Sequence, residues 1–185
     1  MNEPDDSHWV QACLQGEHDA FRRLVERHGD AVYNLAYRMT SSASTAEDLA
    51  QDTFIRAHSR LYQYRPEFAF RNWVLGICAN LARSRYRRMR RRQRMEREFA
   101  LHEALRQEAY VAQCDSLSAH EMLDQALMRL PNRLRAPLVL RYMEGLSVQD
   151  VAQTLGLRLS ATKMRLARGH DKLRKTLLRA GEENA

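Results

Sequence analysis

The sequence predicts an all-α protein made of two small helical modules joined by a partly helical connector. Apolar residues recur at three- and four-residue steps along most of the 185-residue chain, as they do in helices that bury one face. Ser44 and Ser147 each stand three positions before an acidic residue at the start of such a run, the pattern of a capping box. The net charge also changes sign in blocks, which suggests separate modules. It is −4 over residues 1–61, +9 over 62–94, −4 over 95–130 and +6 over 131–185.

The first module begins with two helices whose spacing places apolar side chains inward. A short helix is expected over His8–Gln15 and ends at Gly16. A longer one follows from Asp19 to Met39, with Gly29 as a candidate bend. Both helices are expected to supply core residues.

A third helix is expected over Ala46–Leu61, started by a capping box of Ser44 and Glu47. Phe54 falls on its inner face. An isoleucine among charged side chains on the outer face can dock on a protein, although an ordinary solvated face with one apolar residue explains it as well. The outward residues are Asp48, Gln51, Asp52, Ile55 and Arg56.

The fourth helix, over residues 70–94, is the element around which this module is organised. Its first half buries an apolar face that includes Phe70 and Trp73, and from Arg83 onward it carries eight arginines. Arginines at this density repel one another unless a polyanion neutralises them, so this half is expected to bind nucleic acid. The preceding loop, YQYRPEF, has three aromatic rings that can stack on unpaired bases or pack in the core.

Residues 95–118 contain neither glycine nor proline and reverse the sign of the charge, so they are expected to form a partly helical connector. The second module starts near Ala119 with a helix closed by Pro131. A further helix, over Leu134–Met143, is expected to end at Gly145.

The end of the chain has the pattern of a helix-turn-helix. A capping box of Ser147 and Asp150 starts a short helix, a turn follows at 156–159, and Ser160 is expected to cap a long basic helix. Residues near the start of that second helix would reach base edges, whereas later ones would meet phosphates. Its inner face is expected to hold Thr162, Leu166, Gly169, Leu173 and Leu177.

No pattern in the sequence predicts catalysis or a bound metal. Cys13, Cys78 and Cys114 have no CxxC spacing, and the histidines form no metal-binding cluster. Neither a signal peptide nor an apolar run of membrane-spanning length is present. We therefore expect a reduced, cytoplasmic protein that is not an enzyme and has no cofactor or membrane insertion.

Three motifs, in their order and spacing, resemble the extracytoplasmic-function group of bacterial sigma factors. They are AEDLAQDTF at 46–54, FRNWVLGICANLARSRYRR at 70–88, and LPNRLRAPLVLRYMEGLSVQDVAQTLG at 130–156 followed by KMRLARGHDKLR at 163–174. The resemblance implies a helical sigma domain two at 8–94, which binds core RNA polymerase and melts the minus-ten element. A linker at 95–118 then leads to sigma domain four at 119–178, a helix-turn-helix that recognises the minus-thirty-five element.

The resemblance also implies roles for individual residues. Asp48, Gln51, Asp52 and Phe54 match the family segment that packs on the clamp helices of the polymerase beta-prime subunit. Because the helical spacing places Phe54 inward, we expect it to support the contact. The contact residues are then expected to be Asp48, Gln51, Asp52, Ile55 and Arg56. Reading of the minus-ten element falls to Tyr64, Asn80, Arg83, Ser84, Arg87, Arg88 and Arg91. Reading of the minus-thirty-five element falls to Ser160, Lys163, Met164, Ala167 and Arg168. The chain departs from the family pattern at Ser84, where aspartate is usual, at Ser160–Thr162, where Gly-Thr-Val is commoner, and at Met164, which replaces a small polar residue.

The implied partners are core RNA polymerase, promoter DNA and an anti-sigma factor that hides the polymerase-binding faces. Masking of a basic face in cis by the acidic connector is the alternative to the anti-sigma factor. Two other classes of protein compete with the sigma factor. One is a free-standing helix-turn-helix regulator that binds a duplex operator without polymerase. The other is an arginine-rich RNA-binding protein, which leaves the helix-turn-helix unexplained.

Overall fold

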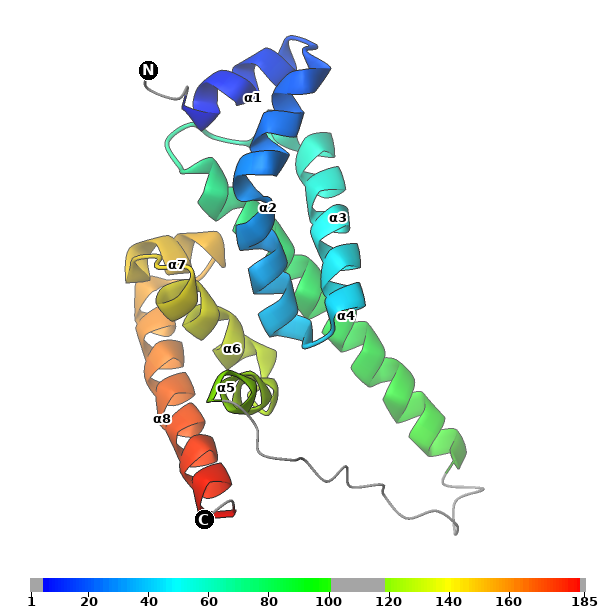
Figure 1. The fold of residues 1–185 in the computed structure, drawn as a ribbon, viewed down its shortest axis with the longest axis vertical. Helices are drawn as coiled ribbons and strands as arrows, with labels where there is room; N and C mark the ends of the chain where they lie inside the picture. Colours follow the sequence, from blue (N-terminus) through cyan, green and yellow to red (C-terminus); the bar gives the residue numbers. More distant parts are fainter. Residues whose placement is uncertain (1–4, 101–118, 184–185) are drawn as a thin grey trace.

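The computed structural model describes residues 5–100 and 119–183, and every regular element in these ranges is helical (Figure 1). The predicted all-α fold is therefore confirmed. Most of the connector predicted over 95–118 lies outside the described residues. Its first part, 95–100, continues the long helix before it.

Five elements precede the connector. They are α1 (Asp6–Leu14), α2 (His18–Thr40), α3 (Ala43–Ser59), the short 3-10 turn η1 (Leu61–Gln63) and α4 (Phe70–Ala100). The chain leaves α1 through Gly16, whose φ of +99° is a conformation that glycine adopts without strain. α2 continues through Gly29 as one helix, so the candidate bend is not a break.

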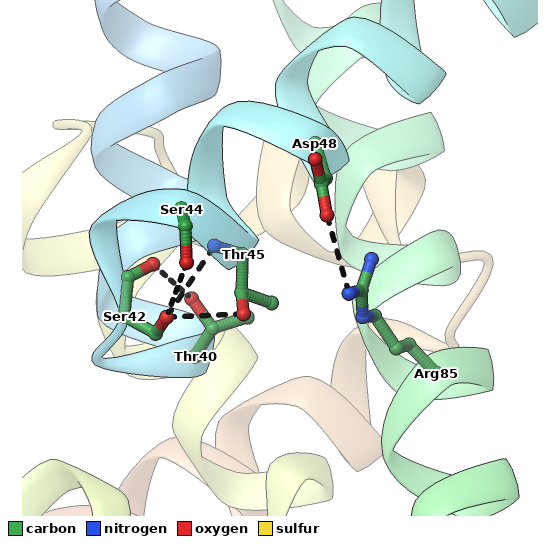
Figure 2. Close-up of polar contacts among 6 residues, drawn as sticks. All are labelled: Thr40, Ser42, Ser44, Thr45, Asp48 and Arg85. Atoms are coloured by element: carbon green, nitrogen blue, oxygen red, sulfur yellow. Dashed lines mark hydrogen bonds and ion pairs between the residues drawn. The ribbon is translucent and has the colours of Figure 1, made fainter.

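The cap of α3 differs from the prediction. Ser42 is the N-cap, and its Oγ accepts a hydrogen bond from the backbone N–H of Thr45 at 3.3 Å (Figure 2). Ser44 lies inside the first turn of α3, so the predicted box of Ser44 with Glu47 is wrong. The reason is that α2 ends at Thr40 and its C-cap Ser41 takes the left-handed conformation, with φ of +51°, so that Ser42 alone separates this cap from the start of α3.

The elements after the connector are α5 (Ala119–Met128), α6 (Asn132–Leu138), the π-turn η2 (Val139–Met143), α7 (Val148–Thr154) and α8 (Leu159–Glu183). The capping box of Ser147 and Asp150 is confirmed, because both of its hydrogen bonds are present. α8 begins at Leu159, so Ser160 lies within the helix and is not its cap. Because the helix starts at Leu159, the residue at the N-cap position is Arg158, two positions before the predicted serine.

The helix predicted over Leu134–Met143 is real but changes register part of the way along. Pro137 lies inside it and has no N–H to donate to the preceding turn. Beyond it the backbone widens to a π-turn, with the N–H of Glu144 donating to the carbonyl of Val139 at 3.1 Å. Gly145, at φ of +72°, then ends the helix as predicted.

One apolar core runs through both parts of the chain. Leu24, Phe70 and Cys78 from the first part belong to the same buried cluster as Val139 and Leu140 from the second. In Figure 1, α3 lies on one side of α2, whereas α5, α6, α7 and α8 lie on the other. The second part therefore packs on the first instead of standing apart from it.

Candidate nucleic-acid and protein-binding surfaces

An aromatic cluster anchors the start of α4. The ring of Phe70 is fully buried and lies 5.5 Å from the ring centroids of both Tyr64 and Trp73. His28 of α2 packs on its other side at 5.4 Å. These rings fix the position of the first turn of α4. Because α4 is one continuous helix, the arginines further along it are held in fixed positions relative to the core.

The basic half of α4 projects away from this anchor. Arg87, Arg88 and Arg91 are exposed and have no ion-pair partner among the described residues. Arg83 is half-buried and donates to the side-chain oxygen of Asn80. Burial lowers the pKa of Arg83, as do the nearby charges of Arg87 and Arg165. Such a row of guanidinium groups with few carboxylates beside it suits a phosphate backbone.

The remaining residues expected at the minus-ten element have mixed surroundings. Tyr64 is half-buried, and its hydroxyl donates to the carbonyl of Phe68 at 2.6 Å. It therefore holds the loop in place as well as lying near the basic helix. Tyr62, which is 71% exposed, and Phe68, which is 38% exposed, are the open rings of this loop. Both belong to the three rings that the sequence offered for base stacking, although only Tyr64 was assigned to the minus-ten element. Asn80 is exposed and Ser84 is half-buried.

The outer face of α3 presents the residues expected to bind a protein. Asp48, Gln51, Asp52 and Arg56 are exposed, and Ile55 is 61% exposed although it is apolar. Phe54 is buried, with its ring against Phe21. Figure 2 shows Asp48 facing α4, where one of its oxygens lies 3.4 Å from Arg85. This pair links the α3 face to the basic half of α4.

The long helix of the helix-turn-helix has the two faces that its spacing predicts. Thr162 and Leu166 are buried, and Gly169 packs so closely that a Cβ there would lie 3.0 Å from the side chain of Leu138. The opposite face is open to solvent. Its exposed residues are Ser160, Lys163, Met164, Ala167 and Arg168.

Contacts between the two parts of the chain are the feature that sequence reasoning missed. Arg71 of α4 pairs with Glu144 at 2.6 Å, and Arg38 of α2 pairs with Asp124 of α5 at 2.6 Å. Arg135, only 1% exposed, donates to the backbone carbonyl of Met39 at 2.9 Å. Residues so distant in sequence give no periodic signal of their pairing.

The described residues do not form a candidate metal site of three or more His, Cys, Asp or Glu side chains. The Cys78 thiol is buried beside the carbonyl of Val32, and burial raises its pKa to about 12. A thiol in this environment stays protonated and is a poor nucleophile. Among the described helices, none is both long and apolar enough to cross a bilayer.

The geometry defines a class of protein: a helix-turn-helix module packed on a second helical module with its own basic helix. Comparison with known families gives a match to Sigma-70 region 2 over residues 24–92 and to Sigma-70 region 4 over residues 120–173. The ECF RNA polymerase sigma factor SigW of Bacillus subtilis is 30% identical, over 91% of this chain and 94% of its own length.

Two solved structures are similar in both sequence and fold. One is CnrH in complex with the cytosolic domain of CnrY, with a TM-score of 0.68 and 28% identity over 95% of this chain and 97% of that one. The other is the sigma factor RpoE of Bartonella quintana in complex with the anti-sigma factor NepR. Its TM-score is 0.64, with 25% identity over 85% of this chain and 96% of that one.

The chain belongs to the ECF group of the sigma-70 family. It is an alternative sigma factor that directs transcription, and a free-standing regulator is not favoured.

Proposed function

We propose that this sigma factor divides its work between two domains, at 8–94 and 119–178, joined by the linker at 95–118. The first binds core RNA polymerase and opens the minus-ten element, and the second recognises the minus-thirty-five element. One observation carries the proposal. The solvent-facing arginines of α4 and the open face of α8 are two separate basic surfaces on rigid helices. The protein itself performs no chemistry, which belongs to the polymerase, and it acts in the cytoplasm.

The polymerase-binding surface in this proposal is the outer face of α3. Ile55 is an exposed apolar residue that can pack against a partner protein. The carboxylates beside it can pair with basic side chains of that partner. The partner is the pair of clamp helices of the beta-prime subunit. The contacting residues are Asp48, Gln51, Asp52, Ile55 and Arg56.

The minus-ten surface combines a stacking loop with the basic helix. Opening DNA requires unstacking, and capture of a flipped base on the aromatic loop of Tyr64 would offset this by ~1–3 kcal/mol. The exposed rings of Tyr62 and Phe68 widen that loop surface. The residues assigned to the strand and its backbone are Asn80, Arg83, Ser84, Arg87, Arg88 and Arg91.

The minus-thirty-five surface is the start of α8. Lys163 and Arg168 supply donors for guanine and phosphate, and Met164 supplies an apolar contact. Ser160 and Ala167 complete the face. We also infer an anti-sigma factor as a partner, because the similar RpoE was solved in complex with one.

The decisive experiment is in vitro transcription with core RNA polymerase, the purified chain and a pool of genomic promoter fragments, with sequencing of transcript starts. Starts that share two upstream motifs and depend on the chain support the proposal. An absence of initiation and of polymerase binding would overturn it.

Two substitutions test the assigned surfaces in the same assay. Asp52→Arg should weaken polymerase binding, with Glu47→Arg, exposed on the same helix, as the matched control. Lys163→Ala with Arg168→Ala should cost about 1–3 kcal/mol for each lost base contact. Their control is Lys172→Ala with Arg174→Ala, on later turns of α8 where phosphate contacts are expected; it should weaken use of all promoters alike and leave the preference between them unchanged. Unchanged binding by Asp52→Arg would remove the docking assignment.

A further inference from the structure

A small cavity lies where α4 of the first domain meets α6 and α8 of the second. Its volume is about 20 Å³, which is more than one buried water molecule needs. Arg83 of α4, Asn132 and Arg133 of α6, and Arg165 of α8 supply its polar lining. None of the described residues that line it is acidic, and the others are Met39, Ala79, Ala136, Pro137 and Leu155. Three guanidinium groups therefore share one cavity without a carboxylate.

The charges of these three arginines are not balanced within the described part of the chain. Arg83 and Arg165 are half-buried and Arg133 is exposed, and none of them pairs with a carboxylate there. Arg83 donates to the side chain of Asn80, which is neutral. Burial lowers the pKa of Arg83, and the charges of Arg87 and Arg165 lower it further. The two half-buried guanidinium groups thus repel each other where water screens them only in part.

Other arginines between the two domains do have an anionic partner. Arg38 lies 2.6 Å from a carboxylate oxygen of Asp124, and Arg71 lies 2.6 Å from one of Glu144. The cavity is thus a place between the domains where positive charge gathers and where a bound anion would be favourable.

Asn132 adds a side chain that is buried without hydrogen bonds. It is 7% exposed, and neither its Oδ1 nor its Nδ2 has a hydrogen-bond partner among the described residues. A buried amide that lacks both partners is unfavourable. Its Nδ2 can donate to an anion, whereas its Oδ1 needs a donor in return.

Hydrogen phosphate is a small anion that satisfies all of these groups. Its unprotonated oxygens accept from guanidinium groups, which bind phosphate through paired N–H donors. They also accept from the Nδ2 of Asn132, while the P–OH group donates to Oδ1. Sulfate has the same charge and shape but no hydroxyl, and a DNA phosphodiester lacks both the second charge and the hydroxyl. The lining therefore favours inorganic phosphate over these two anions.

We propose that the cavity between α4, α6 and α8 binds one hydrogen phosphate ion, held by Arg83, Asn132, Arg133 and Arg165. The ion enters beside Arg133, the exposed residue of the lining. Because the four residues come from both domains, bound phosphate stabilises the packing between them, and the stability of the chain rises with phosphate concentration. This goes beyond the proposed function, which uses only Arg83 of these residues and assigns it to DNA.

The test uses the full chain in a chloride buffer at mildly alkaline pH, where inorganic phosphate is mostly hydrogen phosphate. Isothermal titration calorimetry measures the binding of sodium phosphate, of sodium sulfate and of dimethyl phosphate, which mimics the DNA backbone, all at matched ionic strength. Thermal unfolding with the same additions is followed by circular dichroism.

We expect saturable binding of phosphate and about tenfold weaker binding of the other two anions, because they leave the Oδ1 of Asn132 without a donor. Phosphate at about a hundredfold above its dissociation constant should raise the Tm by about 5–10 °C.

Three variants show whether the ion lies in this cavity. Arg165→Gln removes one guanidinium group, and Asn132→Asp keeps the shape of the side chain but places a negative charge beside the ion. Each should weaken phosphate binding about tenfold or more and reduce the rise in Tm. Arg129→Gln is the matched control, because it removes the same charge from an exposed position of the second domain outside the cavity. It should bind phosphate as the unmodified chain does.

Three results would overturn the proposal. An absence of saturable phosphate binding would mean that the cavity holds only water. Sulfate or dimethyl phosphate bound as tightly as phosphate would indicate unspecific attraction of anions or a contact with the DNA backbone. An equal loss of affinity in Arg129→Gln and Arg165→Gln would indicate a general effect of positive charge, and this comparison decides alone if Asn132→Asp proves to be unfolded. No readout involves transcription, so failure of the proposed function would be a separate result.

Discussion

At the scale of single residues, Arg135 has the most demanding environment in the described part of the chain. Its guanidinium is buried without a carboxylate partner and donates to the carbonyls of Met39, Met128 and Leu130 at 2.9, 2.7 and 2.9 Å. Burial lowers its pKa, because the charged form loses water. The carbonyls at the ends of α2 and α5 depend on this one side chain.

Arg135→Met should therefore lower the free energy of unfolding by about 2 kcal/mol or more, since it leaves buried carbonyls without donors. Urea unfolding followed by circular dichroism measures the loss. Arg133→Met, exposed on the same helix, is the control and should change stability by less than about 0.5 kcal/mol. Equal effects of the two substitutions would mean that the Arg135 hydrogen bonds do not stabilise the fold.

His28 makes stability depend on pH in the mildly acidic range. It is 5% exposed, its Nε2 lies 3.0 Å from a carboxylate oxygen of Asp6, and burial lowers its pKa below 6.5 in spite of that carboxylate. As the pH falls below 6.5, His28 becomes protonated in the unfolded chain but stays neutral in the folded chain until a lower pH. The contribution of His28 to the free energy of unfolding is therefore fully present above pH 6.5 and is lost as the pH falls.

We expect His28→Gln to flatten the decline in unfolding free energy between about pH 7.5 and 5.5, whatever its effect at neutral pH. His170→Gln, an exposed histidine of α8, controls for the loss of an imidazole and should keep the original slope. Parallel curves for the unmodified chain and His28→Gln would contradict the assignment.

At the scale of elements, the start of α3 offers the sharpest comparison, because two nearby serines have different roles. Ser42 caps the helix, whereas Ser44 is exposed in its first turn (Figure 2). Ser42→Ala should cost about 1 kcal/mol of stability, the usual value of a lost N-cap. Ser44→Ala should be neutral within about 0.5 kcal/mol. Thermal unfolding of both variants decides, and a larger loss for Ser44→Ala would restore the original capping prediction.

The helix ends and helix faces of this fold show what a sequence can and cannot predict. Ser147 and Asp150 were identified correctly because a capping box needs only residues three apart. The sequence predicted Ser44 as the cap of α3, but the position of this cap depends on where α2 stops, and a left-handed Ser41 has no sequence signature. The buried face of α8 could be predicted from the spacing of its apolar residues. The π-turn at Val139–Met143 could not, because Pro137 indicates a disturbed helix but not which hydrogen bonds replace the lost one.

At the scale of the whole molecule, the contacts between the two domains were beyond sequence reasoning. Arg135 looked like one of many arginines, and its burial depends on a helix 96 residues away in sequence. Gly76 was one available signal, because a glycine inside an amphipathic helix can mark close packing, and a Cβ there would lie 2.7 Å from the backbone oxygen of Thr154. Most of the residues expected to bind polymerase and DNA are exposed, whereas Tyr64, Arg83 and Ser84 are half-buried, and the roles of all of them stay predictions.

The ion pair between Arg38 and Asp124 tests whether this packing exists in solution. Its atoms are 2.6 Å apart and both side chains are about three-quarters buried, so screening by water is limited. Arg38→Asp alone, or Asp124→Arg alone, sets like charges against each other and should expand the molecule in small-angle X-ray scattering. The exchange of both charges restores an attractive pair between the same two helices. We expect a coupling free energy of about 0.5–3 kcal/mol from urea unfolding of the four chains, with the double variant as compact as the unmodified one. Two single effects that simply add would mean that α2 and α5 do not meet in solution.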